Sequence, residues 1–108
     1  MLNQVIMVGR LSKEVEVKEL EDNKKQAVIS LAIPRSYKNA EGIYETDFVD
    51  CILYDNIAQN TKEYCSKGDI IGVKGRIQSR IVENDDKKEN KMEIVAEKIT
   101  FLSSKKED

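Results

Sequence analysis

The chain has 108 residues, the length of one domain, and 35% of them are charged, with a formal net charge of −2. It contains no apolar stretch of about 18 residues and no basic-then-apolar leader after Met1, so we expect neither a membrane span nor a secretory signal. Histidine and zinc-type cysteine spacing are absent, which removes the commonest general base and nucleophile pairs; we therefore expect no enzyme, no cofactor and no metal site.

The pattern of apolar and polar residues predicts five strands. Their apolar residues alternate with a period of two, and polar or glycine-containing turns separate them. The strands are expected at residues 2–17, 27–33, 45–54, 69–82 and 92–102. Pro34 is expected to end the second strand, because proline cannot donate a hydrogen bond to a strand ladder. The segment 83–91 is almost wholly charged or amide, and it is expected to form a loop.

One short helix is expected over residues 56–66, between the third and fourth strands, with Gly68 near its end. This order of elements is typical of a mainly β architecture, the OB-fold, which is a five-stranded Greek-key barrel. Other small α+β folds share the order, so the order alone leaves them open. We expect the barrel to span residues 1–103 and a short solvated tail to follow at 104–108.

The fourth strand has one apolar or small face and one basic face. The basic face carries Lys74, Arg76 and Arg80, and the last two would lie about 13 Å apart on an extended strand. That separation suits two phosphates of a nucleic-acid backbone, and a charged outer face is also ordinary for a half-exposed strand. Lys87 and Lys88 in the next loop could bind phosphates on a flexible segment. The acidic and basic charges of that loop nearly cancel, however, which favours a solvated hairpin.

Aromatic residues are predicted on the outer face of the third strand, at Phe48 and Tyr54. Rings beside arginines are what nonspecific single-strand binders use, because every base can stack on a ring. The same rings would serve equally well as anchors of a subunit interface. Tyr37 in the preceding loop could close over a bound strand, whereas Tyr64 and Phe101 are expected in the core.

Six short blocks spread over residues 1–102 are the most specific feature of the sequence. They are Asn3-x-Val5-x-x-Val8-Gly9-Arg10-Leu11, Leu31-Ala32-Ile33-x-Arg35, Glu45-Thr46-Asp47-Phe48-Val49-x-Cys51, Lys67-Gly68-Asp69, Gly75-Arg76-Ile77-Gln78-Ser79-Arg80 and Glu93-x-Val95-Ala96-Glu97-x-Ile99-x-Phe101-Leu102. Together, and in this order, they resemble the bacterial single-stranded-DNA-binding protein family. The resemblance implies an OB-fold that assembles, usually as a homotetramer, and binds single-stranded DNA in replication, recombination and repair.

By position, the resemblance also implies which side chains meet the DNA. It places base-stacking rings at Tyr37, Phe48 and Tyr54, and basic contacts at Arg10, Arg35, Arg76 and Arg80. A further aromatic of the family corresponds here to Val82, which offers no ring. The family usually continues into a disordered tail with an acidic, hydrophobic tip that recruits partners. This chain stops at Asp108, as a trimmed or short variant would, so tail-mediated recruitment of replication partners is doubtful.

The preferred hypothesis is therefore sequence-independent binding of single-stranded DNA in the cytoplasm, in association with the nucleoid. The acidic charge balance supports a second hypothesis, an OB-fold interaction subunit of a replication or primosome complex with little affinity for DNA. A third is binding of single-stranded RNA, which a site distinguishes from DNA through the 2′-hydroxyl.

Overall fold

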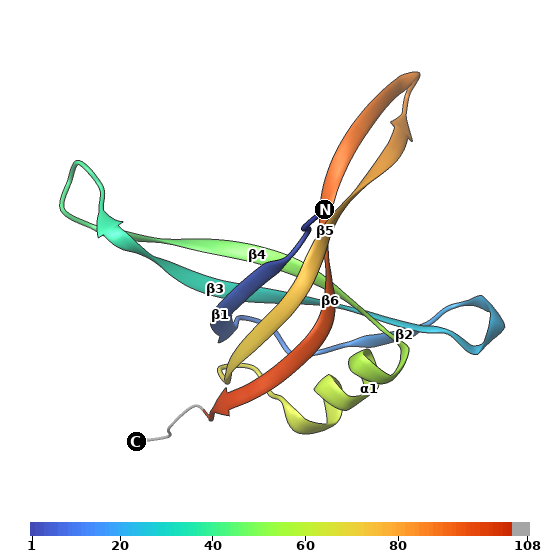
Figure 1. The fold of residues 1–108 in the computed structure, drawn as a ribbon, viewed down its shortest axis with the longest axis horizontal. Helices are drawn as coiled ribbons and strands as arrows, with labels where there is room; N and C mark the ends of the chain where they lie inside the picture. Colours follow the sequence, from blue (N-terminus) through green and yellow to red (C-terminus); the bar gives the residue numbers. More distant parts are fainter. Residues whose placement is uncertain (105–108) are drawn as a thin grey trace.

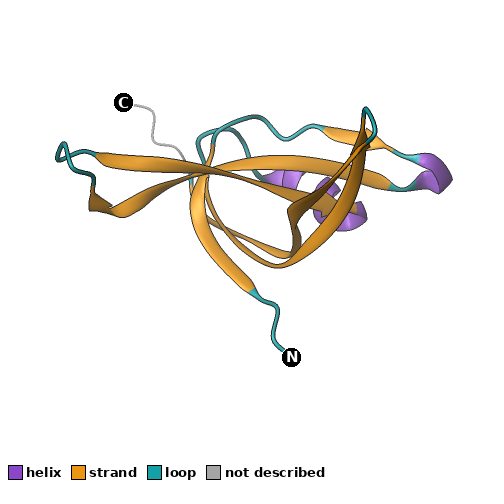
Figure 2. Cartoon of the chain, turned by 90° about the horizontal axis from the view of Figure 1, so that it is seen from above, coloured by secondary structure: helices purple, strands orange, loops and turns teal. Residues whose placement is uncertain are grey.

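The computed structural model describes residues 1–104, most of which lie in β-strands (Figures 1 and 2). The strands are β1 (Val5–Leu11), β2 (Val17–Glu19), β3 (Lys25–Lys38), β4 (Tyr44–Tyr54), β5 (Ile70–Asn84) and β6 (Lys87–Ser103). Helix α1 (Asp55–Tyr64) connects β4 to β5, and a 3-10 turn, η1 (Glu21–Asn23), follows β2. Of the predicted tail, 104–108, only Ser104 lies within the described residues.

Five strands close into a barrel. Neighbours pair in the order β1-β5-β6-β4-β3, and β1 returns to β3 through Arg10 and Leu11. Most pairs are antiparallel, and β4 and β6 form a parallel pair around Ile52 and Val95. The short β2 adds to the edge of β3. The closed barrel with one helix between β4 and β5 confirms the predicted OB-fold, and β2 is an additional strand where a continuation of the first was expected.

Alternate residues of the barrel strands fill the core. Leu31, Cys51, Leu53 and Ile71 are fully buried, since successive side chains of a strand point to opposite faces and these four point inward. The helix α1 packs on the barrel through Ala58 and its neighbours. No helix in the described part of the chain has the length and apolar character that a membrane span requires.

The hairpin of β3 and β4 projects well beyond the barrel (Figure 1). The prediction that the second strand ends at Pro34 was wrong, because β3 continues to Lys38. Pro34 lies opposite Thr46, and the register then shifts before Lys38 pairs with Tyr44. A bulge of this kind tolerates a residue that lacks an N–H.

The hairpin of β5 and β6 also projects from the barrel (Figure 1). The segment 83–91 was expected to be a loop, but both strands run through it and only Asp85 and Asp86 form the turn, with φ values of 43° and 68°. Positive φ at both positions is what a tight two-residue hairpin turn requires. Because β5 leaves the barrel, Ile77 and Ile81, which share the parity of its core residues, are exposed.

Tyr64 and Phe101 were expected in the core, and that prediction was wrong. They are 74% and 46% exposed and line an open groove of about 390 Å³ between α1 and β6. Small residues, Ala58 and Thr61, form the buried side of α1, and Tyr64 lies on the part of the helix surface that is exposed. Cys65, which follows the helix, is buried instead.

Candidate nucleic-acid interface

The outer face of β4 presents two aromatic side chains, with Phe48 67% exposed and Tyr54 38% exposed. Phe48 pairs with Ala32 of β3, and Ala32 pairs in turn with Arg10 of β1. Paired residues on neighbouring strands point to the same face, so Arg10 and Phe48 stand about 10 Å apart across two strand spacings. One Arg10 nitrogen donates to the carbonyl of Gly68, and this hydrogen bond leaves the other N–H groups of the guanidinium to face solvent.

A groove of about 450 Å³ connects this face to the β5–β6 hairpin. Val28 and Ile52, paired across β3 and β4, lie on one side together with Tyr54, and Arg80 and Lys91 lie on the other. The structure therefore brings Tyr54 and Arg80, which are distant in sequence, into one groove. An extended polyanion with flat bases could be held there by a ring on one wall and cations on the other.

The two arginines of β5 have different partners. Arg76 is exposed and donates to Oε1 of Gln78. Arg80 Nη2 lies 3.2 Å from Oε2 of Glu93, and its side chain is 63% exposed. Exposed ion pairs contribute little net stability, so Arg80 can exchange this carboxylate for a phosphate at small energetic cost.

Arg35 is held more firmly than the other predicted contacts. Its Nε and Nη2 donate to both carboxylate oxygens of Asp47, and its Nη1 lies 2.9 Å from Oε2 of Glu45. The hydrogen bonds to Asp47, helped by the negative charges, raise the pKa of Arg35 above its usual range, and the same contact lowers the pKa of Asp47. Arg35 thus ties β3 to β4 at the base of the hairpin that carries the exposed Tyr37.

The remaining predicted cations do not line the groove. Lys74 of β5 pairs with Lys98 of β6 on the barrel wall. Lys87 and Lys88 lie at the exposed end of the hairpin, where Lys88 is 3.8 Å from Glu83. These three side chains can raise the local positive potential, but a bound strand would have to leave the groove to touch them.

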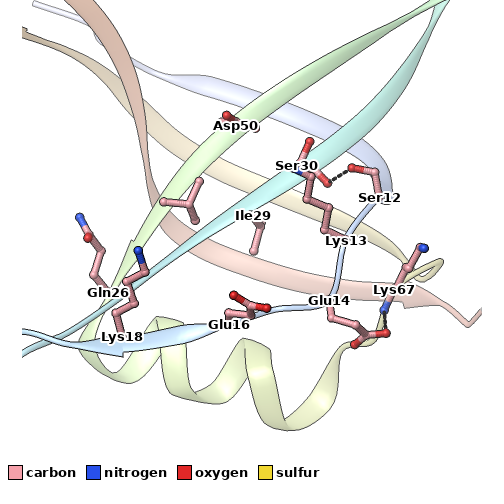
Figure 3. A pocket seen from close by; sticks show the side chains of 11 residues that line it. Ser12, Lys13, Glu14, Glu16, Lys18, Gln26, Ile29, Ser30, Asp50 and Lys67 are labelled. Atoms are coloured by element: carbon pink, nitrogen blue, oxygen red, sulfur yellow. Dashed lines mark hydrogen bonds between the residues drawn. The ribbon is translucent and has the colours of Figure 1, made fainter.

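A second groove, of about 560 Å³, was not predicted from the sequence. It shares Gln26, Val28 and Asp50 with the first groove, and its other wall carries Lys13 from the segment between β1 and β2 and Lys18 from β2 (Figure 3). The sequence does not indicate this groove, because both lysines belong to an ordinary polar stretch. Only the fold brings that stretch alongside β3. The two grooves together make a longer track than the predicted residues alone define.

The chain shows no other constellation of reactive groups among residues 1–104. Cys51 and Cys65 are free and buried, and burial raises the pKa of the Cys51 thiol to about 11. No group of three metal-binding side chains is present in this part of the molecule. The open face of β4 and its two grooves are therefore the candidate site.

A barrel of this topology with an aromatic, partly basic groove defines an OB-fold domain suited to unpaired nucleic acid. Residues 2–102 match the family described as "Single-strand binding protein family". The chain belongs to this family, as the six sequence blocks predicted. Single-stranded DNA binding is the activity of that family.

Individual relatives agree with this assignment. The chain is 41% identical over 106 residues to Single-stranded DNA-binding protein B of Bacillus subtilis, with 97% of this chain and 94% of that protein aligned. It is also 41% identical over 106 residues to Single-stranded DNA-binding protein 3 of Listeria innocua, of which it covers 66%. The fold matches a Plasmodium falciparum SSB in complex with single-stranded DNA, with a TM-score of 0.82, 26% identity, and coverage of 95% of this chain and 96% of that one.

Proposed function

We propose that this chain binds and protects single-stranded DNA without catalysis, through bases stacked on Phe48 and Tyr54. The observation that carries the proposal is the exposed ring of Phe48, which shares a sheet face with Arg10 and opens toward the groove of Tyr54 and Arg80. Every base has a π face, so stacking accepts any sequence and contributes about 1–3 kcal/mol per base. A domain over residues 1–103 would serve replication, recombination and repair in this way.

Phosphate contacts complete the proposed interface. Arg80 lines the hairpin side of the groove, and Arg76 precedes it on the same face of β5. Arg10 lies beyond Phe48, and Tyr37 with Arg35 extends the track along the β3–β4 hairpin. Lys74, Lys87 and Lys88 would engage DNA that continues around the molecule. The carboxylates of Asp47 and Glu45 already offset the charge of Arg35, and the carboxylate of Glu93 offsets that of Arg80. The salt dependence should therefore be shallower than a count of these cations suggests, because fewer counterions are released.

We also propose that copies of this chain assemble, as the homotetramers of the family do. Among residues 1–104, β1 pairs with β5 along Val5–Arg10 but with β3 only at Arg10 and Leu11, which leaves one edge of its first half unpaired. The side chains of Ile6 and Val8 on this strand are 71% and 53% exposed. A free strand edge flanked by apolar side chains is a template for pairing with a second copy. Light scattering should report a multimer, and Val8→Lys should lower its mass.

The ligand class is tested by titrating labelled oligo-dT, oligo-U and duplex DNA of equal length at two salt concentrations. We expect oligo-dT to bind best, and to bind more weakly at high salt because each counterion that a phosphate contact releases then gains less entropy. No binding of oligo-dT at low salt would contradict the proposal and favour a protein-interaction module. Tighter binding of oligo-U would make RNA the ligand, and association with the nucleoid would then no longer be expected.

A further inference from the structure

Asp50 occupies the centre of the proposed interface. It lies on β4 between Phe48 and Tyr54 on the same outward face, and it lines both grooves. Figure 3 shows it among the residues of the larger groove. Residues two apart on a strand are separated by about 7 Å. A base stacked on Phe48 therefore has its edge within reach of the Asp50 carboxylate.

Asp50 has no partner, in contrast to the carboxylates that precede it on β4 and the one across the smaller groove. Glu45 and Asp47 of the same strand are paired with Arg35, and Glu93 across the groove is paired with Arg80. Within residues 1–104, the side chain of Asp50 forms none of the hydrogen bonds or ion pairs of the structure, and it is exposed. Its acceptor oxygens are thus available to a bound ligand.

A free carboxylate on a DNA-binding face must meet either a phosphate or a base. It repels a phosphate and, when ionised, can only accept hydrogen bonds. Thymine presents one N–H between two carbonyl oxygens, which the carboxylate also repels. Cytosine and adenine present an amino group, and guanine presents two adjacent N–H donors that match the two carboxylate oxygens.

We propose that Asp50 reads the base edge at one position of the track and favours guanine, then cytosine and adenine, over thymine. The stacking rings on either side remain indifferent to sequence, so the preference is confined to one nucleotide for each protomer. The inference rests on the proposed function, because Asp50 acts only on a base that the neighbouring rings already hold.

The test compares two labelled oligonucleotides of about 12 nucleotides, oligo-dT and the same strand with one central guanine, a length within the range that one OB-fold covers. The wild-type chain is expected to bind the guanine-containing strand about fivefold more tightly, at the lower end of what a paired base contact gives. Asp50→Ala should bring the ratio close to one. Asp50→Asn should also lower the ratio, and it should strengthen binding of oligo-dT because a charge that repels phosphates is gone.

Glu97→Gln is the matched control. Glu97 is an exposed carboxylate that lines the groove between α1 and β6, away from this face, so its neutralisation should leave the ratio unchanged. A ratio that is the same in the wild type, Asp50→Ala and Asp50→Asn would overturn the role of Asp50 while leaving DNA binding intact. Absence of binding to both strands by the wild type would instead overturn the proposed function.

Discussion

Phe48 lies directly opposite Ala32 across the β3–β4 ladder, and the small partner leaves the ring uncovered. A larger side chain at residue 32 would pack against the ring, since residues directly opposite on paired strands are in contact. The same ladder places Arg10 on the other side of Ala32. The stacking surface and its nearest guanidinium thus depend on one alanine in the middle strand.

Removal of the rings should weaken DNA binding in proportion to the bases that they hold. Phe48→Ala and Tyr54→Ala should each lower the binding free energy for oligo-dT by about 1–3 kcal/mol, as measured by fluorescence anisotropy. Tyr64→Ala is the control, because Tyr64 is more exposed than either ring but lines the groove between α1 and β6. Equal loss of affinity in all three variants would show that the face of β4 has no special role.

A ring placed at Val82 should strengthen binding. Val82 has the same strand parity as Arg80 of the groove and pairs with Glu89 in the hairpin. Val82→Trp should raise the affinity for oligo-dT by up to about 1–3 kcal/mol, and the new fluorescence should be quenched on binding, since the chain has no tryptophan of its own. Ile81→Trp, on the opposite face of the strand, should show neither effect; quenching of equal size in both variants would contradict this assignment.

Gly75 should be required for the path of β5. A Cβ there would overlap the carbonyl oxygen of Val95, at the point where the β5–β6 register shifts. Gly75→Ala should therefore lower the free energy of unfolding by about 1–3 kcal/mol, the range for a forced fit in a packed region. Gly72→Ala is the control in urea denaturation, since its Cβ would meet Leu102 and Thr100 at an ordinary 3.8 Å. Equal free energies of unfolding for the two variants would contradict this role of Gly75.

The contact between Arg35 and Asp47 should appear in the acid titration of the protein. Hydrogen bonding to Arg35 lowers the pKa of Asp47 below its ordinary value of about 3.9. Because the folded pKa is depressed, the stabilisation is present above the ordinary value and is lost as the pH falls through the folded pKa. The Asp47 carboxyl resonance should titrate at lower pH in the wild type than in Arg35→Gln, and identical midpoints would show that the contact does not persist in solution.

Much of the barrel could be predicted from sequence because its strands alternate in polarity. The alternation along residues 45–54 places Phe48 and Tyr54 outside and Cys51 inside, and the burial of these side chains confirms it. The ends of the strands were missed at Pro34 and in 83–91, because local composition favours turns there. Pairing across each hairpin supplies the hydrogen bonds that local sequence does not reveal.

The types of residue at the candidate site could be predicted from the sequence, but the ion pairs between them could not. Arginines on strands suggest phosphate contacts, yet whether Arg35 or Arg80 is free depends on which carboxylate the register brings beside it. Asp50 and the second groove were missed for the same reason. A single acidic residue on an exposed strand face does not indicate a binding site until the fold shows that it lines two grooves.

The most direct test of the interface is ultraviolet cross-linking of the protein to oligo-dT, followed by mass spectrometry of the linked peptides. The exposed aromatic residues are distributed over two surfaces, so the cross-linked positions identify the surface that holds the bases. We expect adducts at Phe48 and Tyr54, with Tyr37 as a further position. Adducts confined to Tyr64 and Phe101 would place the DNA in the groove beside α1 and would contradict the account.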